Sequence, residues 1–303
     1  MEAATLVGLI ASVLLLILIG LALRLLKVLT REDADVLNKI IVYLALPALI
    51  FTAIRQSEPT FALLLIPLLG WLIILAGFGV AFAAGRLMRL ERRTFGGFLL
   101  VSALGNTGYL GYPLALAIFG QRQLVKAVFY DVFGTALALL TLGVYLATVY
   151  GEPAGGETRR LVEIVTFPPL VAVALGFVLR PVPLPGFLLQ VLDYLAGATV
   201  PLIMVAIGLS LRPGHIVEYK LPIAVTGIIK LGLAPLLALV AARLAGLPAV
   251  DAGILILQAS MPVMTLSFVI GQRHRLNTDF IPAAIFVTTA AAALTIPLWQ
   301  LLA

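Results

Sequence analysis

The sequence predicts an all-α membrane protein with ten transmembrane helices. Of its 303 residues, 62% are hydrophobic and only 11% are charged, whereas soluble domains are about 45–50% apolar and about 25% charged. A soluble fold could not cover so apolar an interior with polar surface, so we expect lipid around most of the protein. Apolar runs of about 20 residues, the length that a spanning helix requires, recur along the chain. No segment alternates as the strands of a membrane barrel would.

Polar breaks separate the ten apolar runs, and no long linker or low-complexity segment divides them into more than one membrane domain. The start of the chain lacks the basic residues of a cleaved signal peptide, so we expect the first run to remain as a helix. Residues 1–150 then hold helices one to five, 151–160 form a short loop, and 161–303 hold helices six to ten. The expected crossings are 4–27, 38–55, 61–86, 95–119, 125–150, 161–180, 188–211, 222–245, 250–271 and 280–302.

Basic residues are concentrated in the loops that follow odd-numbered helices. Fourteen of the 20 lie there: Arg24, Lys27, Arg31, Lys39, Arg86, Arg89, Arg92, Arg93, Arg159, Arg160, Arg212, Lys220, Arg273 and Arg275. Five lie in the other loops, namely Arg55, Arg122, Lys126, Arg180 and Arg243, and Lys230 lies within a helix. This bias predicts that the odd-numbered loops are cytoplasmic and that both termini are outside. The net charge of +6 could suggest a nucleic-acid partner. We do not expect one, because the basic residues lie in short clusters between apolar runs.

Two halves of five helices each would enter the membrane from opposite sides, as the inverted repeats of many transporters do. Prolines occur in the same order in both halves: Pro47 and Pro201 interrupt the second and seventh helices, and Pro113 and Pro262 the fourth and ninth. We therefore predict an inverted repeat. The alternative is that these prolines are ordinary kinks in an unrelated bundle.

The fourth helix contains three glycines, an amide and a proline within residues 105–113, and the ninth contains a similar polar break at 258–267. Lipid cannot satisfy the backbone groups that such breaks expose, so they are expected to face protein or a watery cavity. Two broken helices in equivalent places favour a substrate site near the middle of the membrane, where half-helix N-termini attract an anion. The candidate substrate-binding residues are Asn106, Thr107, Gly108, Pro113, Gln258, Ser260, Met261, Pro262 and Thr265. Alternatively, the amides merely tie helices together.

Two ionisable residues, Asp131 and Lys230, lie well inside apolar helices, where a charge costs about 2.5–3.5 kcal/mol. Asp131 is a candidate coupling carboxylate, and Lys230 is a candidate cation for an anionic substrate. Each also has an ordinary explanation: Asp131 bonds a neighbouring helix, or Lys230 extends its ammonium to the membrane surface.

These motifs resemble the auxin efflux carrier family, which includes plant auxin carriers and bacterial permeases. The likeness covers essentially the whole chain and is most specific at Asn106-Thr107, Pro113-Leu114 and 258–262. It implies a fold like that of the bile acid and sodium symporters. It also implies an elevator-type carrier of small organic anions, auxin-like acids or dicarboxylates, in the cell membrane. Helices three to five and eight to ten would move against a scaffold of one, two, six and seven, in a homodimer.

This sequence departs from the plant carriers in two places. The central loop at 151–160 is short, and no acidic residue lies between Phe61 and Gly85 in the third helix. Regulation through a long loop and coupling through a third-helix carboxylate are therefore not expected.

Other functions remain as alternatives. A sodium-coupled organic-acid symporter would need a cluster of oxygen ligands, whereas only scattered hydroxyls occur. An intramembrane aspartyl protease would need a second aspartate in a Gly-x-Gly-Asp motif, which is absent. A channel or a receptor could also use polar breaks in its helices. Because the chain has no cysteine and no hydrolase motif, we expect no catalytic residues, cofactor or metal ion.

Overall fold

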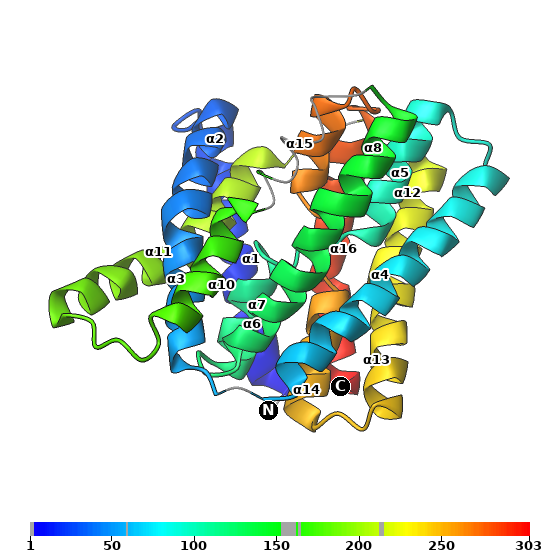
Figure 1. The fold of residues 1–303 in the computed structure, drawn as a ribbon. Helices are drawn as coiled ribbons and strands as arrows, with labels where there is room; N and C mark the ends of the chain where they lie inside the picture. Colours follow the sequence, from blue (N-terminus) through cyan, green and yellow to red (C-terminus); the bar gives the residue numbers. More distant parts are fainter. Residues whose placement is uncertain (1–2, 59, 153–161, 163–164, 212–214) are drawn as a thin grey trace. The chain divides into compact units, whose positions relative to one another are not determined.

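The computed structural model describes residues 3–58, 60–152, 162, 165–211 and 215–303. In this part of the chain the secondary structure is helical, and the only β-type pairing is an isolated bridge between Gly105 and Val263 (Figure 1). Most of the expected loop at 151–160, with Arg159 and Arg160, lies outside the described residues, as does Arg212. The all-α prediction is confirmed for the described residues.

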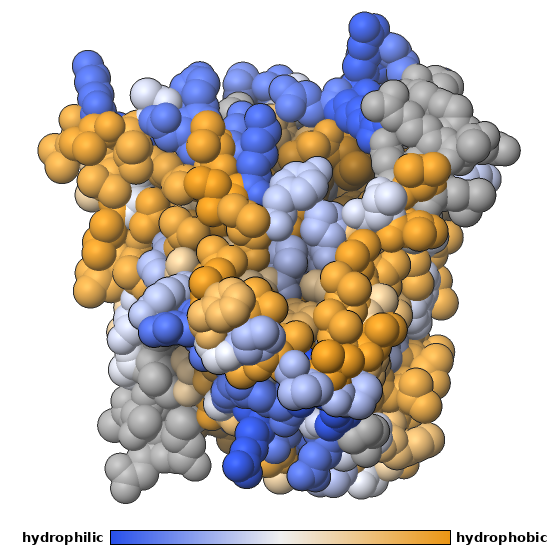
Figure 2. Space-filling view, turned by 60° about the vertical axis from the view of Figure 1, so that its left-hand side comes forward, coloured by the Kyte–Doolittle hydropathy of each residue, from blue (hydrophilic) through white to orange (hydrophobic). Residues whose placement is uncertain are grey.

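Six continuous helical stretches are long and apolar enough to cross a membrane: Glu32–Gln56, Ala62–Leu87, Leu124–Tyr150, Gly186–Ser210, Lys220–Leu244 and Phe280–Leu302. Shorter apolar helices occupy Ala11–Leu25, Pro168–Val178 and Ala249–Ala259. Large apolar side chains on these helices are exposed, for example Leu72 and Leu294, and apolar residues cover much of the visible face in Figure 2. This surface suits a multi-pass membrane protein, while ten crossings in an inverted repeat stay a prediction.

The chain forms two compact units, and each contains segments from both halves of the sequence. Unit 1 comprises Met1–Thr60, Tyr112–Val128 and Thr158–Leu211, and unit 2 comprises Phe61–Gly111, Phe129–Glu157 and Arg212–Ala303. The helices of unit 1 are α1 (Ala3–Leu25), α2 (Arg31–Ile40), the π-helical η1 (Ile41–Ala45), α3 (Leu46–Gln56), α6 (Gly111–Phe119), α7 (Leu124–Phe129), α10 (Pro168–Val178) and α11 (Gly186–Ser210). Only the first residue of α6 and the last residue of α7 belong to unit 2.

Glycines allow α1 and α11 to pack closely in unit 1. A Cβ atom on Gly20 would lie 2.4 Å from the Val205 carbonyl oxygen, and one on Gly208 would lie 2.1 Å from that of Ile17. Small residues permit such backbone contact between membrane helices. The polar break before α2 forms a capping box, in which Thr30 and Asp33 bond each other's backbone N–H groups.

The expectation that Pro47 and Pro201 interrupt their helices is wrong. Pro47 lies at the start of α3, directly after η1, within the continuous stretch Glu32–Gln56. The π-turn makes the Leu46 N–H bond the Ile41 carbonyl, and this wider turn accommodates a proline ring that would clash in a regular helix. Pro201 lies inside the unbroken α11. A membrane helix tolerates a proline where neighbouring helices, hydroxyl side chains or small local adjustments satisfy the carbonyl that it frees.

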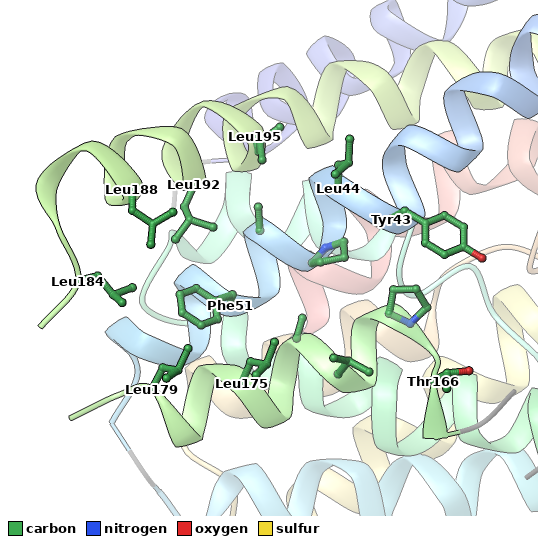
Figure 3. Close-up of a pocket in the computed structure, with 15 residues that line it drawn as sticks. Tyr43, Leu44, Phe51, Thr166, Leu175, Leu179, Leu184, Leu188, Leu192 and Leu195 are labelled. Carbon is green, nitrogen blue, oxygen red and sulfur yellow. The ribbon is translucent and has the colours of Figure 1, made fainter. Parts of the chain in front are cut away.

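Unit 1 also contains an apolar cavity of about 520 Å³ among η1, α3, α10 and α11 (Figure 3). Phe51, Leu175 and Leu188 are among the aliphatic and aromatic side chains that line it. Near one end, Arg55 donates to the carbonyls of Leu179 and Val182. A lining of this kind offers few groups that could orient a polar solute, so the cavity is not the candidate substrate site.

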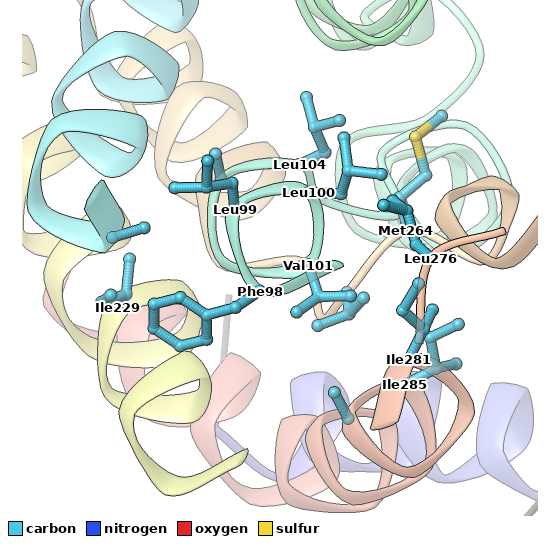
Figure 4. Packing of buried hydrophobic residues seen from close by; sticks show 14 of the residues in the cluster. Phe98, Leu99, Leu100, Val101, Leu104, Ile229, Met264, Leu276, Ile281 and Ile285 are labelled. Carbon is cyan, nitrogen blue, oxygen red and sulfur yellow. The ribbon is translucent and has the colours of Figure 1, made fainter. Parts of the chain in front are cut away.

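Unit 2 is built around a buried helix, α5, in which every residue from Thr94 to Ala103 is buried. Phe98, Leu100 and Val101 pack among side chains from η4, α16 and the 260–276 segment (Figure 4). The helices of this unit are α4 (Ala62–Leu87), α5 (Arg92–Ala103), η2 (Tyr130–Ala136), η3 (Leu139–Gly143), α8 (Val144–Tyr150), α12 (Lys220–Gly227), η4 (Ile228–Leu233), α13 (Ala234–Leu244), α14 (Ala249–Ala259), α15 (Leu266–Arg273) and α16 (Phe280–Leu302).

Candidate functional site

Two non-helical segments lie side by side in unit 2, as the sequence predicts. One follows the end of α5 at Ala103, and the other joins α14 to α15. The Asn106 N–H donates to the Pro262 carbonyl at 2.8 Å, and the Met264 N–H donates to the Leu104 carbonyl at 3.1 Å. These bonds satisfy backbone groups that the broken helices expose. We call residues 104–110 and 260–265 the first and second crossover segments.

Pro113 does not cause the break in the fourth crossing, so that part of the expectation is wrong. It is the third residue of α6, in the first helical turn, where a missing N–H leaves no helix bond unmade. The break lies before it, at residues 104–110. Pro113 also belongs to unit 1, whereas the other candidate residues belong to unit 2.

Three of the predicted polar side chains lie at or beside the crossover segments. Asn106 Nδ2 donates to Thr265 Oγ1 at 3.0 Å. The Gln258 amide packs against Gly111, since a Cβ atom there would lie 2.2 Å from Gln258 Oε1. Gln258 is fully buried and Asn106 is 5% exposed. Asn106 therefore bonds across the two segments, while Gln258 reaches the backbone directly after the first segment, where glycine allows the close approach.

The other predicted residues of the second segment are buried but less clearly functional. Ser260 Oγ donates to the Leu257 carbonyl of its own helix at 2.8 Å. Met261 is fully buried, and Pro262 contributes its carbonyl to the pairing. Ser260 therefore acts as a local cap for the end of α14.

Asp131 is held against the first crossover segment. Thr107 Oγ1 donates to Asp131 Oδ1 at 2.5 Å, and a Cβ atom on Gly108 would lie 2.9 Å from Oδ2. Asp131 is 6% exposed and lies in η2. The Thr107 hydroxyl therefore bonds the Asp131 carboxylate, and the absence of a side chain at Gly108 leaves room for it.

Lys230 reaches the same segment from η4. A Cβ atom on Gly105 would lie 3.0 Å from Lys230 Nζ and 3.4 Å from the Met261 carbonyl oxygen. The side chain is 3% exposed, which excludes an ammonium extended to the membrane surface. No hydrogen bond or ion pair joins Lys230 to another described residue. A buried ammonium without a partner is unfavourable, so this position favours a bound anion.

Thr288 of α16 is a residue that sequence reasoning missed. Its Oγ1 accepts the Val263 N–H at 3.2 Å and donates to the Ala284 carbonyl at 2.7 Å. The hydroxyl therefore supports the second crossover segment from behind. The two consecutive hydroxyl residues Thr288 and Thr289 in an otherwise apolar helix could have indicated this role from the sequence.

The site combines amide and hydroxyl groups with one ammonium and one carboxylate. Among the described residues, no group of three His, Asp or Glu side chains could hold a metal ion. The arrangement is suited to binding a small polar or anionic solute. The α15 N-terminus directly follows the second segment and places the positive end of its dipole there.

Comparison with known proteins gives the family. The sequence matches the family described as "Membrane transport protein" over residues 5–154 and 157–300. It is 34% identical over 298 residues to an uncharacterized transporter of Methanocaldococcus jannaschii, covering 95% of each chain. It is 33% identical over 293 residues to an uncharacterized transporter of Methanothermobacter thermautotrophicus, again covering 95% of each chain.

A third relative, from Rhizobium meliloti, carries the name "Putative malonate transporter". It is 31% identical over 280 residues, which cover 86% of this chain and 84% of the relative. The predicted resemblance is thereby confirmed. The chain belongs to the membrane transport protein family, that of the auxin efflux carriers, and is a membrane transporter.

Proposed function

We propose that this protein is a secondary transporter that carries a small organic anion across the cell membrane, with the carboxylate held at the crossover segments. The observation that carries the proposal is Lys230, whose buried ammonium lies beside Gly105 with no partner among the described residues. A hydrogen bond to a charged group contributes about 1.5–3 kcal/mol. A bound carboxylate would supply that bond.

The surrounding groups favour a carboxylate over an inorganic cation. Asn106 and Gln258 can donate from their amides without adding charge, and the α15 N-terminus adds a partial positive charge. The relative whose name refers to malonate makes a dicarboxylate a reasonable first substrate to test. Asp131 would disfavour a second negative charge beside Thr107, so the ligand's other end would lie away from it.

An elevator-type mechanism is part of the proposal. The amides, Thr107, Asp131, Lys230 and Thr265 all belong to unit 2. Unit 1 holds the first, second, sixth and seventh crossings and also Tyr112–Val128, which the sequence assigns to the moving helices four and five. Because Asn106, Thr107 and Gln258 are buried, a solute can reach them only after a rearrangement. Movement of unit 2 as a body would give that access alternately from each side. We also propose a homodimer, as the family resemblance implies.

Transport of malonate into proteoliposomes is the direct test. We expect uptake of labelled malonate, competition by other small carboxylates, and none by the neutral diamide malonamide. Thermal-shift measurements with the same compounds should give the same ranking. Repeating the uptake with sodium replaced by choline, and at several pH values, distinguishes sodium coupling from proton coupling. Stabilisation by cationic or neutral solutes, with no response to any carboxylate, would refute the anion proposal.

The absence of cysteine makes the mechanism testable by labelling. A single cysteine at Thr265, which is partly exposed, should react with a membrane-impermeant thiol reagent from both sides of the membrane. Malonate should slow that reaction. A cysteine at Lys27, outside unit 2, should react from one side only, with or without malonate. Reactivity of residue 265 from one side alone would contradict alternating access.

The orientation of the chain needs a separate measurement. Reporter fusions at residue 155 should show the 151–160 loop in the cytoplasm, and fusions at the C-terminus should show that end outside. An external 151–160 loop would overturn both the predicted topology and the inverted repeat.

A further inference from the structure

A second cavity, of about 430 Å³, lies in unit 2 where α4 ends and α5 begins. Arg86, Arg89 and Arg92 line it together with Phe95 and Tyr150, and none of the described lining residues is acidic. It shares no residue with the crossover segments. Three guanidinium groups around one cavity favour a ligand with phosphate or carboxylate oxygens.

The packing beneath the cavity holds two of these arginines in place. Arg86 lies over the rings of Phe82 and Phe95, at 5.1 and 5.7 Å. The Phe95 ring in turn meets Tyr150 at 4.9 Å, and Arg92 Nη2 donates to the Val149 carbonyl at 2.7 Å. Each contact uses only part of a guanidinium group, which has five N–H donors. The remaining donors are positioned for a ligand.

Arg89 adopts a backbone conformation that arginine ordinarily avoids. Its φ is 53°, in the left-handed region where helices usually end on glycine. The turn is a regular helix ending, with the Leu90 N–H bonded to the Gly85 carbonyl at 3.2 Å. Glycine would fit this turn with less strain, so keeping an arginine there implies a use for its side chain.

The same choice recurs along the chain. The three non-glycine residues with positive φ in the described part are Lys27, Arg89 and Arg275, and all are basic. Each follows an odd-numbered crossing. The positive-φ glycines, Gly120 and Gly246, follow even-numbered crossings. In the loops after odd-numbered crossings, which are the most basic, the left-handed backbone position is therefore occupied by a positively charged residue and not by glycine.

We propose that Arg86, Arg89 and Arg92 bind the phosphodiester headgroup of an anionic membrane lipid. Exposed apolar residues beside the lining arginine Arg86 distinguish a lipid from free phosphate: its neighbour Leu87 is 86% exposed, and Phe82, whose ring lies under Arg86, is 44% exposed. These side chains provide a surface for acyl chains beside the headgroup. The bound lipid would join the end of α4 to α5 and α8, and so would stabilise unit 2.

Arg89→Gly is the most informative variant, because glycine relieves the backbone strain and should not impair folding. Lys27→Gly is the matched control: it makes the same change at another positive-φ basic residue that does not line the cavity. Delipidated protein in detergent would be titrated with phosphatidylglycerol, phosphatidylcholine or inorganic phosphate, with binding followed by native mass spectrometry and thermal unfolding.

We expect phosphatidylglycerol to bind and stabilise the parent protein and Lys27→Gly equally. Arg89→Gly should bind it about fivefold more weakly, the change that corresponds to about 1 kcal/mol for one basic residue near anionic lipid. Arg86→Gln should weaken binding in the same direction. Equal phosphatidylglycerol binding by Arg89→Gly and Lys27→Gly overturns the proposal. So does equal stabilisation by phosphatidylcholine, or by inorganic phosphate alone, which would indicate a general lipid effect or a free-anion site.

Discussion

Two π-helical turns, η2 and η4, each place a buried charged side chain against the first crossover segment. They differ in whether that side chain has a partner within the protein. In η2, Asp131 accepts the Thr107 hydroxyl at 2.5 Å. In η4, Lys230 has no partner among the described residues, although it is 3% exposed and Asp131 is 6% exposed. A charge satisfied within the protein holds the backbone in place, whereas one left unsatisfied favours a ligand of opposite charge. On the proposed function, Asp131 would support the first crossover segment and Lys230 would bind the solute beside it.

The largest effect is expected from Lys230→Gln. Loss of a charge-assisted hydrogen bond should weaken carboxylate binding about 10- to 100-fold. Without ligand, the variant should unfold at a higher temperature than the parent, because a buried unpaired ammonium is removed. Lys220→Gln, an exposed residue of the same helical stretch, is the control and should change neither property. Lower stability with unchanged binding would mean that Lys230 has a structural role.

Thr107→Val should mainly affect stability. Removing the hydroxyl that bonds the buried Asp131 should lower the free energy of unfolding by about 1–2 kcal/mol. Thr107→Ser retains a hydroxyl and should recover most of that loss. Denaturant titration of both variants measures the difference. If carboxylate binding fell as far as in Lys230→Gln while stability stayed constant, the proposed division between the two turns would be wrong.

Asn106→Ala tests the amide between the two charges. It should weaken carboxylate binding about fivefold, since a neutral hydrogen bond contributes about 1 kcal/mol. Thr265→Val is the comparison variant because it removes the present partner of Asn106 Nδ2 and leaves the amide in place. Isothermal titration should show weaker binding in the first variant only. Equal loss in both would mean that the Asn106–Thr265 contact itself is what matters.

The smallest effect is expected from Gly105→Ala. Its Cβ atom would lie 3.0 Å from Lys230 Nζ, and the flexible end of the lysine can move slightly to relieve the contact. We expect binding to weaken by no more than about threefold, or about 0.6 kcal/mol. Gly79→Ala, where a Cβ atom meets nothing within 4 Å, should leave binding unchanged. A gain in affinity for Gly105→Ala would place the ligand on the other side of the lysine.

Much of the site could be predicted from residue types in an apolar context. Asn106, Gln258, Asp131 and Lys230 stand out because polar groups are costly in lipid, and all four lie in unit 2. The prolines were less informative. Pro47, Pro113 and Pro201 occupy helical positions in which the missing N–H is tolerated, so their number overstated the breaks.

The sequence by itself determined the helical membrane fold and the presence of a break within 105–113 and another within 258–267. Those properties depend on local chemistry: apolar run length, and glycine or amide residues where a helix cannot continue. Only the tertiary structure decided that Lys230 contacts Gly105, that Thr107 bonds Asp131, and that Thr288 supports Val263. These residues are far apart in the chain, and which of them meet depends on how α5, η2, η4 and α16 pack. The π-turns that aim the two charges also depend on that packing, because a π-turn has no reliable signature in residue type.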